Sequence, residues 1–196
     1  MQSETERINP GYESSLVILV PEAELVVRPF REKHDPSASQ GMPAHITINY
    51  PFQVDLSSRQ NVFDKLAALC SRYQPFRFLF SRVDQLPGVL YLEPDPVYPF
   101  IELIQAVAEE FPESPPYKGE FSKVIPHLTV AQSDNEDDLQ KIKSQFIEFS
   151  RRQLPIDVSA RTVNLMNNRG GTWAVQKNFP LAGLTVKKKL RTQTSG

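Results

Sequence analysis

The same short pattern occurs twice in this chain, as His-Ile-Thr-Ile at residues 45–48 and as His-Leu-Thr-Val at residues 127–130. In an extended strand successive side chains alternate between two faces. The histidine and threonine of each motif therefore share one face, and the two aliphatic residues share the other. The chain has three histidines, and two of them occur in this pattern. We expect two half-buried strands, with the function on their polar faces.

The predicted elements around the two motifs follow one order in both halves of the chain. Each half runs strand, helix, His-x-Thr strand, helix, strand, and the two histidines are 82 positions apart. We interpret this order as an internal duplication of a βαβαβ unit. The predicted fold is α+β and bilobal, with a pseudo-two-fold axis and two antiparallel sheets that flank a central cleft, helices outside. Strands are expected at 16–20, 44–50, 76–83, 89–93, 126–131, 156–164 and 172–176, and helices at 21–33, 57–73, 98–111 and 134–152.

Two imidazoles that face one cavity suit acid–base chemistry near neutral pH, because histidine titrates there. One neutral ring accepts a proton from a nucleophile while the other, protonated, donates a proton to a leaving group on the opposite side of a phosphorus atom. The threonine hydroxyls are short donors to the non-bridging phosphoryl oxygens, where charge builds. We therefore predict that His45, Thr47, His127 and Thr129 are the catalytic residues.

Metal binding is the main alternative for these histidines. Two histidines alone make a poor site, since catalytic zinc normally has three protein ligands. No acidic residue accompanies either motif on the matching face, and the nearest, Asp55, is expected in a turn or in the lead to a helix. The third histidine, His34, lies in a polar helix end and is expected to be solvated. We predict no metal ligand and no cofactor, and we expect Cys70 to be a small core residue rather than a nucleophile.

Length and charge are typical of a soluble globular protein. The 196 residues have a formal net charge of −1, which argues against a protein that binds long duplex nucleic acid through many phosphate contacts. The N-terminal segment is polar, and no apolar run is long enough to span a bilayer. We therefore expect a cytoplasmic protein without membrane association. We expect an N-terminal tail at 1–13, a single bilobal domain at 14–180 and a basic C-terminal tail at 181–196.

With its two motifs and its order of elements, the chain resembles the 2H phosphoesterase superfamily, the group of 2'-5' RNA ligases and 2',3'-cyclic-nucleotide phosphodiesterases. The resemblance covers about residues 16–179, and the flanking segments 43–52 and 115–117 are similar to one bacterial branch. It implies a bilobal fold whose four motif residues line the cleft. It also implies metal-independent cleavage of a phosphodiester, commonly a 2',3'-cyclic phosphate to a 2'-phosphate. For hydrolysis, we assign His127 as the water-activating base and His45 as the acid.

Several residues beside the motifs have two open interpretations. Phe52 and Tyr117 are candidate substrate-binding residues, because aromatic side chains stack on bases in single-stranded recognition. Alternatively, Phe52 belongs to the core and Tyr117 holds its loop. Trp173, on a strand after a Gly-Gly turn, is expected to pack rather than bind. Three basic residues in loops either reach the cleft or are ordinary surface residues: Lys118, Lys123 and Arg169.

Three functions are compatible with this pattern. The first is a metal-independent phosphodiesterase that acts on a small nucleotide or an RNA terminus. The second is a non-catalytic module that binds a nucleotide or an RNA end on the same scaffold. The third is 2'-5' RNA ligase activity, which differs only in the direction of the reaction. In each case we expect a monomer, whose partner is a small nucleotide or an RNA terminus.

Overall fold

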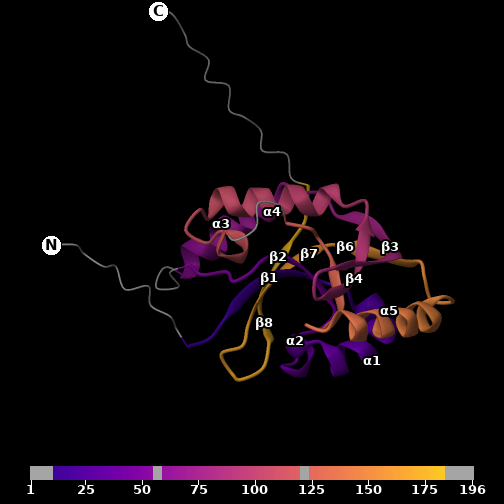
Figure 1. Cartoon of the computed structure of the whole chain (residues 1–196). Helices are drawn as coiled ribbons and strands as arrows, with labels where there is room; N and C mark the ends of the chain where they lie inside the picture. Colours follow the sequence, from indigo (N-terminus) through magenta and orange to yellow (C-terminus); the bar gives the residue numbers. More distant parts are fainter. Residues whose placement is uncertain (1–10, 55–58, 120–123, 184–196) are drawn as a thin grey trace, which may run out of the picture.

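Two four-stranded antiparallel sheets form the middle of the molecule (Figure 1). The computed structural model describes residues 11–54, 59–119 and 124–183. In each sheet a His-x-Thr strand lies at one edge, beside the strand that begins the corresponding half of the chain. The first sheet consists, in spatial order, of β2 (His45–Asn49), β1 (Ser14–Leu19), β7 (Thr162–Asn167) and β8 (Ala174–Pro180).

The second sheet combines strands from both halves of the sequence. β3 (Phe76–Leu86) follows the first motif in sequence, yet it pairs with β4 (Val89–Asp95) because a tight turn joins Leu86 to Val89 and forces the two strands into one antiparallel hairpin. The first half of the chain therefore supplies a strand to the sheet of the second half. In spatial order this sheet consists of β5 (Leu128–Gln132), β4 (Val89–Asp95), β3 (Phe76–Leu86) and β6 (Ile156–Ala160).

The prediction of one strand over residues 156–164 is wrong. β6 ends at Ala160 and β7 begins at Thr162, and the two strands belong to different sheets. The chain crosses between the sheets at Arg161, whose carbonyl accepts a hydrogen bond from the amide of Leu181 at 2.8 Å. The sequence has no glycine or proline at this crossing, so it lacks the usual turn signal. Through this crossing the second half of the chain supplies β7 to the sheet of the first half.

Helices cover the sheets on two sides, which confirms the predicted α+β class with helices outside. Each His-x-Thr strand is packed against a helix from the other half of the chain: α1 (Glu24–His34) contacts β5, and α4 (Tyr98–Glu110) contacts β2. The 3₁₀ turn Pro21–Ala23 leads into α1. One group of helices consists of α3 (Arg59–Ser71) and α4 (Tyr98–Glu110), and the other of α1 (Glu24–His34), α2 (Pro36–Ser39) and α5 (Glu136–Ser150) (Figure 1).

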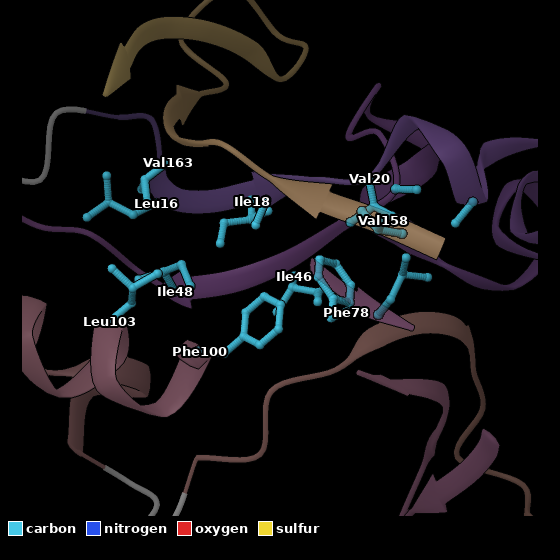
Figure 2. Packing of buried hydrophobic residues seen from close by; sticks show 14 of the residues in the cluster. Leu16, Ile18, Val20, Ile46, Ile48, Phe78, Phe100, Leu103, Val158 and Val163 are labelled. Atoms are coloured by element: carbon cyan, nitrogen blue, oxygen red, sulfur yellow. The ribbon is translucent and has the colours of Figure 1, made fainter. Parts of the chain in front are cut away.

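A continuous apolar core joins the strands of both sheets to the helices. Figure 2 shows Ile46 and Ile48 of β2 directed toward Phe100 and Leu103 of α4. Phe100 also makes an edge-to-face contact with Phe78 of β3, at a centroid distance of 4.9 Å. Each of these side chains is almost completely buried, and burying one such side chain stabilises the fold by roughly 1.5–3 kcal/mol. The core therefore holds the motif strand β2 against elements of the other half.

Among the described residues the first strand, β1, begins at Ser14 and the last, β8, ends at Pro180, and the division into a single domain with two tails stays a prediction. Most of the two predicted tails lies outside the described residues, as does Lys123. Among the residues that the structure describes, no helix is long and apolar enough to cross a bilayer.

Candidate active site

A cavity of about 700 Å³ lies between the two sheets, and the structure brings all four predicted catalytic side chains to it. His45 and Thr47 come from β2, whereas Thr129 lies in β5 and His127 directly precedes that strand. The two edge strands β2 and β5 are in contact although they belong to different sheets. Residues 82 positions apart in the sequence thus share one cavity.

The alternation of each motif strand directs its polar side chains into this cavity. Ile46 and Ile48 of β2 are buried in the core, and Leu128 and Val130 of β5 are fully buried in the same core. The histidine and threonine between them are partly exposed on the opposite face. Burial of the aliphatic residues therefore fixes the register that points the polar pair at the cleft.

Both imidazoles are oriented by the same backbone hydrogen bond. Nδ1 of His45 lies 2.7 Å from the carbonyl oxygen of Pro43, and Nδ1 of His127 lies 2.7 Å from that of Ile125. A carbonyl only accepts, so Nδ1 carries the hydrogen and donates it in each ring. Nε2 of each neutral imidazole is then left as an acceptor for the cavity. In both motifs the acceptor lies two residues before the histidine, so the arrangement is duplicated together with the strands.

Burial makes both imidazoles harder to protonate. It lowers the pKa of His45 from 6.5 to about 4, an effect that the bond to Pro43 opposes. Arg31 and His127 lower this pKa further, and Asp35 raises it. Burial also lowers the pKa of His127, against the opposing effect of its own carbonyl bond. At neutral pH both rings of the free protein are therefore mostly neutral.

A buried ion pair supports the loop that leads into β2. Nε of Arg31 donates to Oδ2 of Asp35 at 2.9 Å, and its Nη2 donates to the carbonyl oxygen of Met42 at 3.0 Å. Oδ1 of Asp35 accepts hydrogen bonds from the amide and hydroxyl of Ser37, at 2.9 and 2.8 Å. Both charged side chains are almost completely buried. Since Met42 lies three residues before His45, this network fixes the approach to the first motif.

Tyr117 lines the cavity from a loop of unusual backbone conformation. Tyr117 and Lys118 both have left-handed dihedrals, with φ values of 50° and 57°, which cost a non-glycine residue roughly 1–2 kcal/mol. The amide of Tyr117 donates to the carbonyl oxygen of Tyr50 at 2.6 Å. Its hydroxyl is hydrogen-bonded to Thr47, and burial raises its pKa. The strained turn therefore delivers a hydroxyl to the first motif, and we take such strain as a sign of function.

Phe52 does not line the cavity, and of its two interpretations the structure supports a place in the core rather than a contact with substrate. It is 3% exposed and packs edge-to-face on Phe111 with the ring centroids 5.2 Å apart. Phe52 lies beyond the end of β2, where strand alternation no longer decides side-chain direction, and its amide donates to the carbonyl oxygen of Ser14 at 2.8 Å. An apolar ring is more stable in the core than in the cleft.

Two aromatic residues of the cavity were not selected from the sequence. Tyr50 follows β2 directly and lines the cavity. Trp173 packs against Val17, Met42 and Met166, as expected, but it also lines the cavity. The flank of the first motif was the available signal for Tyr50. The position of Trp173 depends on the β7–β8 connection folding back over the first sheet, which the local sequence does not specify.

Two of the three basic loop residues lie away from the cavity. Lys118 is exposed and does not line the cavity. The guanidinium of Arg169 lies 5.7 Å from the ring centroid of Tyr12, and Arg169 does not line the cavity either. Within the described ranges, no group of three or more histidine, cysteine or acidic side chains could hold a metal ion.

Two similar sheets around a cleft, each contributing one His-x-Thr motif, define the two-histidine class of phosphoesterase-like proteins. Within that class the chain belongs to the 2'-5' RNA ligase superfamily, whose sequence profile matches residues 19–172. This membership confirms the resemblance drawn from the motifs and supports an enzyme of the phosphoesterase type.

Individual relatives and solved structures agree with the family. A Bacillus anthracis protein provisionally named a phosphoesterase is 26% identical over 165 residues, which are 77% of this chain and 86% of the relative. The fold is similar to TT0787 of Thermus thermophilus, with a TM-score of 0.55, 16% identity and coverage of 88% of this chain and 100% of the other. It is also similar to E. coli LigT complexed with 3'-AMP, with a TM-score of 0.54, 16% identity and coverage of 86% and 96%.

Proposed function

We propose that this chain is a phosphodiesterase that opens the 2',3'-cyclic phosphate of a nucleotide or an RNA terminus to a 2'-phosphate. The observation that carries the proposal is the matched anchoring of the two imidazoles, which leaves Nε2 of both rings for one cavity. Family membership supports phosphoester chemistry. LigT, which shares the fold, has been solved with 3'-AMP and with ATP, so a nucleotide is the reasonable ligand class.

The proposed reaction uses two proton transfers, one on each side of the phosphorus atom. Nε2 of His127 removes a proton from water, and the water oxygen forms a new bond to phosphorus. The bond from phosphorus to the 3'-oxygen breaks in line, and Nε2 of protonated His45 donates a proton to that oxygen. The hydroxyls of Thr47 and Thr129 donate hydrogen bonds to the non-bridging oxygens as their charge increases. The product is a 2'-phosphate with a free 3'-hydroxyl.

The acid of this reaction has to acquire its proton when substrate binds. The pKa of His45 in the free protein is about 4, so its ring is neutral at pH 7. A phosphodiester anion within hydrogen-bond distance stabilises the imidazolium and raises that pKa. Substrate binding and protonation are therefore coupled. If the two roles are reversed, the same coupling applies to His127, whose pKa is also lowered by burial.

The donors of the cavity suit this reaction without a metal ion. They offer two imidazole nitrogens and two motif hydroxyls, whereas a catalytic zinc site normally has three protein ligands. A cyclic phosphate already contains a strained leaving group, so charge stabilisation by hydrogen bonds and proton transfer by imidazoles are the contributions that remain. We accordingly expect activity in the presence of a chelator.

The proposal is tested by hydrolysis of nucleoside 2',3'-cyclic phosphates in EDTA. His45→Ala and His127→Ala should each reduce the rate by about 10²–10⁴-fold, because each removes a general acid or base. The matched control is His34→Ala, which changes the histidine that lies outside the cavity and should retain the wild-type rate. Equal turnover by wild type and the two motif variants would contradict the proposal. Activity that disappears in EDTA would contradict the metal-independent mechanism.

The same assay separates the alternatives. Tight binding of nucleotides without turnover of any cyclic phosphate would indicate a binding module instead. Formation of 2'-5'-linked products from a 2',3'-cyclic phosphate end and a 5'-hydroxyl end would indicate that the cavity also supports ligation. The partner that we propose is a small nucleotide or an RNA terminus, bound by a monomer, and gel filtration with light scattering tests the oligomeric state.

A further inference from the structure

One end of the cavity, beyond the first motif, has an aromatic wall. Tyr50 and Trp173 lie there with ring centroids 6.4 Å apart and planes inclined by 60°. Met42 packs beside them and also lines the cavity. The amide of Trp173 donates to the carbonyl oxygen of Gln40 at 2.9 Å, which ties the wall to the loop before β2. This wall offers flat apolar surface to the part of a ligand that is distant from its phosphorus atom.

Glu13 places a carboxylate at the edge of this wall. The hydroxyl of Tyr50 donates to its Oε1 at 2.7 Å, and Nδ2 of Asn168 donates to its Oε2 at 3.4 Å. The backbone amide of Glu13 donates to Oδ1 of Asn168 at 2.7 Å. Burial and the bond to Glu13 raise the pKa of Tyr50 to about 12, so the hydroxyl keeps its proton. The carboxylate therefore has a fixed position, held from two sides.

The number of residues between Thr47 and Tyr50 gives the length of this part of the cavity. Tyr50 lies three residues beyond Thr47, which corresponds to roughly 10 Å along an extended chain. A nucleoside is of similar length. If phosphorus lies between the two motifs, the nucleoside reaches Tyr50 and a further phosphate group reaches Glu13. Among the described residues that line the cavity, Glu13 is the one carboxylate, and lysine and arginine are absent.

We propose that Glu13 is a specificity-determining residue that selects substrates with a single phosphate group. This inference rests on the proposed function and narrows its substrate class to a nucleoside 2',3'-cyclic phosphate with a free 5'-hydroxyl, so of the two proposed substrates it favours the small nucleotide over the RNA terminus. The nucleoside lies along Tyr50 and Trp173, and a 5'-phosphate or a preceding nucleotide is repelled by the carboxylate. Like charges several ångströms apart in a partly solvated cleft disfavour binding by roughly tenfold.

The kinetic test compares a nucleoside 2',3'-cyclic phosphate that has a 5'-hydroxyl with the same compound carrying a 5'-phosphate. For the wild-type chain, kcat/KM should be about tenfold or more higher for the 5'-hydroxyl compound. Glu13→Gln should reduce this preference by about tenfold, and added salt should reduce it in the wild type. The matched control is Glu32→Gln, an exposed carboxylate of α1 outside the cavity, which should leave the preference unchanged.

A binding measurement keeps the inference testable when no turnover is found. Trp173 is the single tryptophan of the chain, so its fluorescence reports a ligand at this end of the cavity. Dissociation constants are measured for a nucleoside 2'-monophosphate and for the corresponding 2',5'-bisphosphate. Tighter binding of the monophosphate, with the difference lost in Glu13→Gln, supports the inference. Equal or tighter binding of the bisphosphate by the wild type overturns it, whereas absence of hydrolysis overturns only the proposed function.

Discussion

Burial of His45 couples the stability of the fold to pH. Its pKa is 6.5 in an ordinary environment and about 4 in the folded protein. Between these values the unfolded chain binds a proton that the folded chain does not bind. The contribution of the neutral imidazole to stability is therefore complete above pH 6.5, and it is lost progressively as the pH falls from 6.5 to 4.

The size of this effect follows from the two pKa values. Lowering the pH from 7.5 to 4.5 should reduce the free energy of unfolding by ~2.5 kcal/mol through His45 alone. His127 contributes in the same direction, since burial lowers its pKa as well. A domain of this kind is usually stable by about 5–15 kcal/mol, so the loss is a large fraction. In His45→Asn the titrating group is absent, and the variant should lose ~2.5 kcal/mol less than the wild type over the same range.

Urea unfolding at several pH values between 7.5 and 4.5, followed by the fluorescence of Trp173, measures this difference. The comparison uses the slope of unfolding free energy against pH, so a uniform loss of stability in the variant does not affect it. His34→Asn is the control, because His34 lies outside the cavity and its replacement leaves the titration of His45 in place. If His45→Asn shows the wild-type slope, the buried imidazole is not the origin of the pH dependence, and the reasoning is refuted.

Three further predictions concern the residues that support the first motif. Asp35→Asn leaves the buried charge of Arg31 unpaired and should lower the free energy of unfolding by about 3–5 kcal/mol. In the same urea assay the control Arg28→Met, which breaks an exposed ion pair, should lower the free energy of unfolding by less than about 1 kcal/mol. Lys118→Gly should stabilise the fold by about 1 kcal/mol, because glycine adopts φ values near 57° without strain. An unchanged unfolding midpoint would show that the backbone of Lys118 is not strained. Tyr117→Phe, which removes the hydroxyl bonded to Thr47, should reduce kcat/KM for a cyclic nucleotide by up to about tenfold. A wild-type value of kcat/KM would exclude a role of that hydroxyl in the reaction.

Local periodicity was sufficient to predict the motif strands and the buried faces of the helices. The alternation of polar and aliphatic residues around His45 and His127 predicted which side chains face the core, and the structure agrees. Phe100, Leu103 and Val107 are spaced three and four positions apart, which is the helical period, and all three lie on the buried face of α4. These features depend on positions close together in the sequence, where the period of side-chain directions decides burial.

Membership of a strand in a sheet was not predictable in the same way. The sequence pattern indicated two complete halves, but pairing depends on connections that link the halves. The hairpin at Leu86–Val89 carries β3 into the second sheet, and the crossing at Arg161 returns β7 to the first. The turn before Val89 contains Pro87 and Gly88, which are usual turn residues, whereas the crossing at Arg161 has no turn residue. The consequence of either connection for sheet order requires knowledge of the tertiary fold.

The cavity shows the same division between local and tertiary information. The four motif residues follow from strand alternation, and the family resemblance adds their convergence. Trp173 reaches the cavity through the path of the β7–β8 connection, and Tyr117 reaches it through a left-handed turn that lacks glycine at that position. Neither feature has a local sequence signal, because strain at a non-glycine residue is tolerated only when surrounding contacts impose it.

The exchange of elements between the halves explains how two edge strands can hold a defined site. An edge strand pairs on one side only and is less constrained than a central strand. Here β2 is packed against α4 of the second half, and β5 is packed against α1 of the first half. Each motif therefore depends on a helix from the opposite half of the chain. Since neither half alone contains both the motif strand and its supporting helix, the distance between the two imidazoles is set by the complete core rather than by the cleft residues themselves.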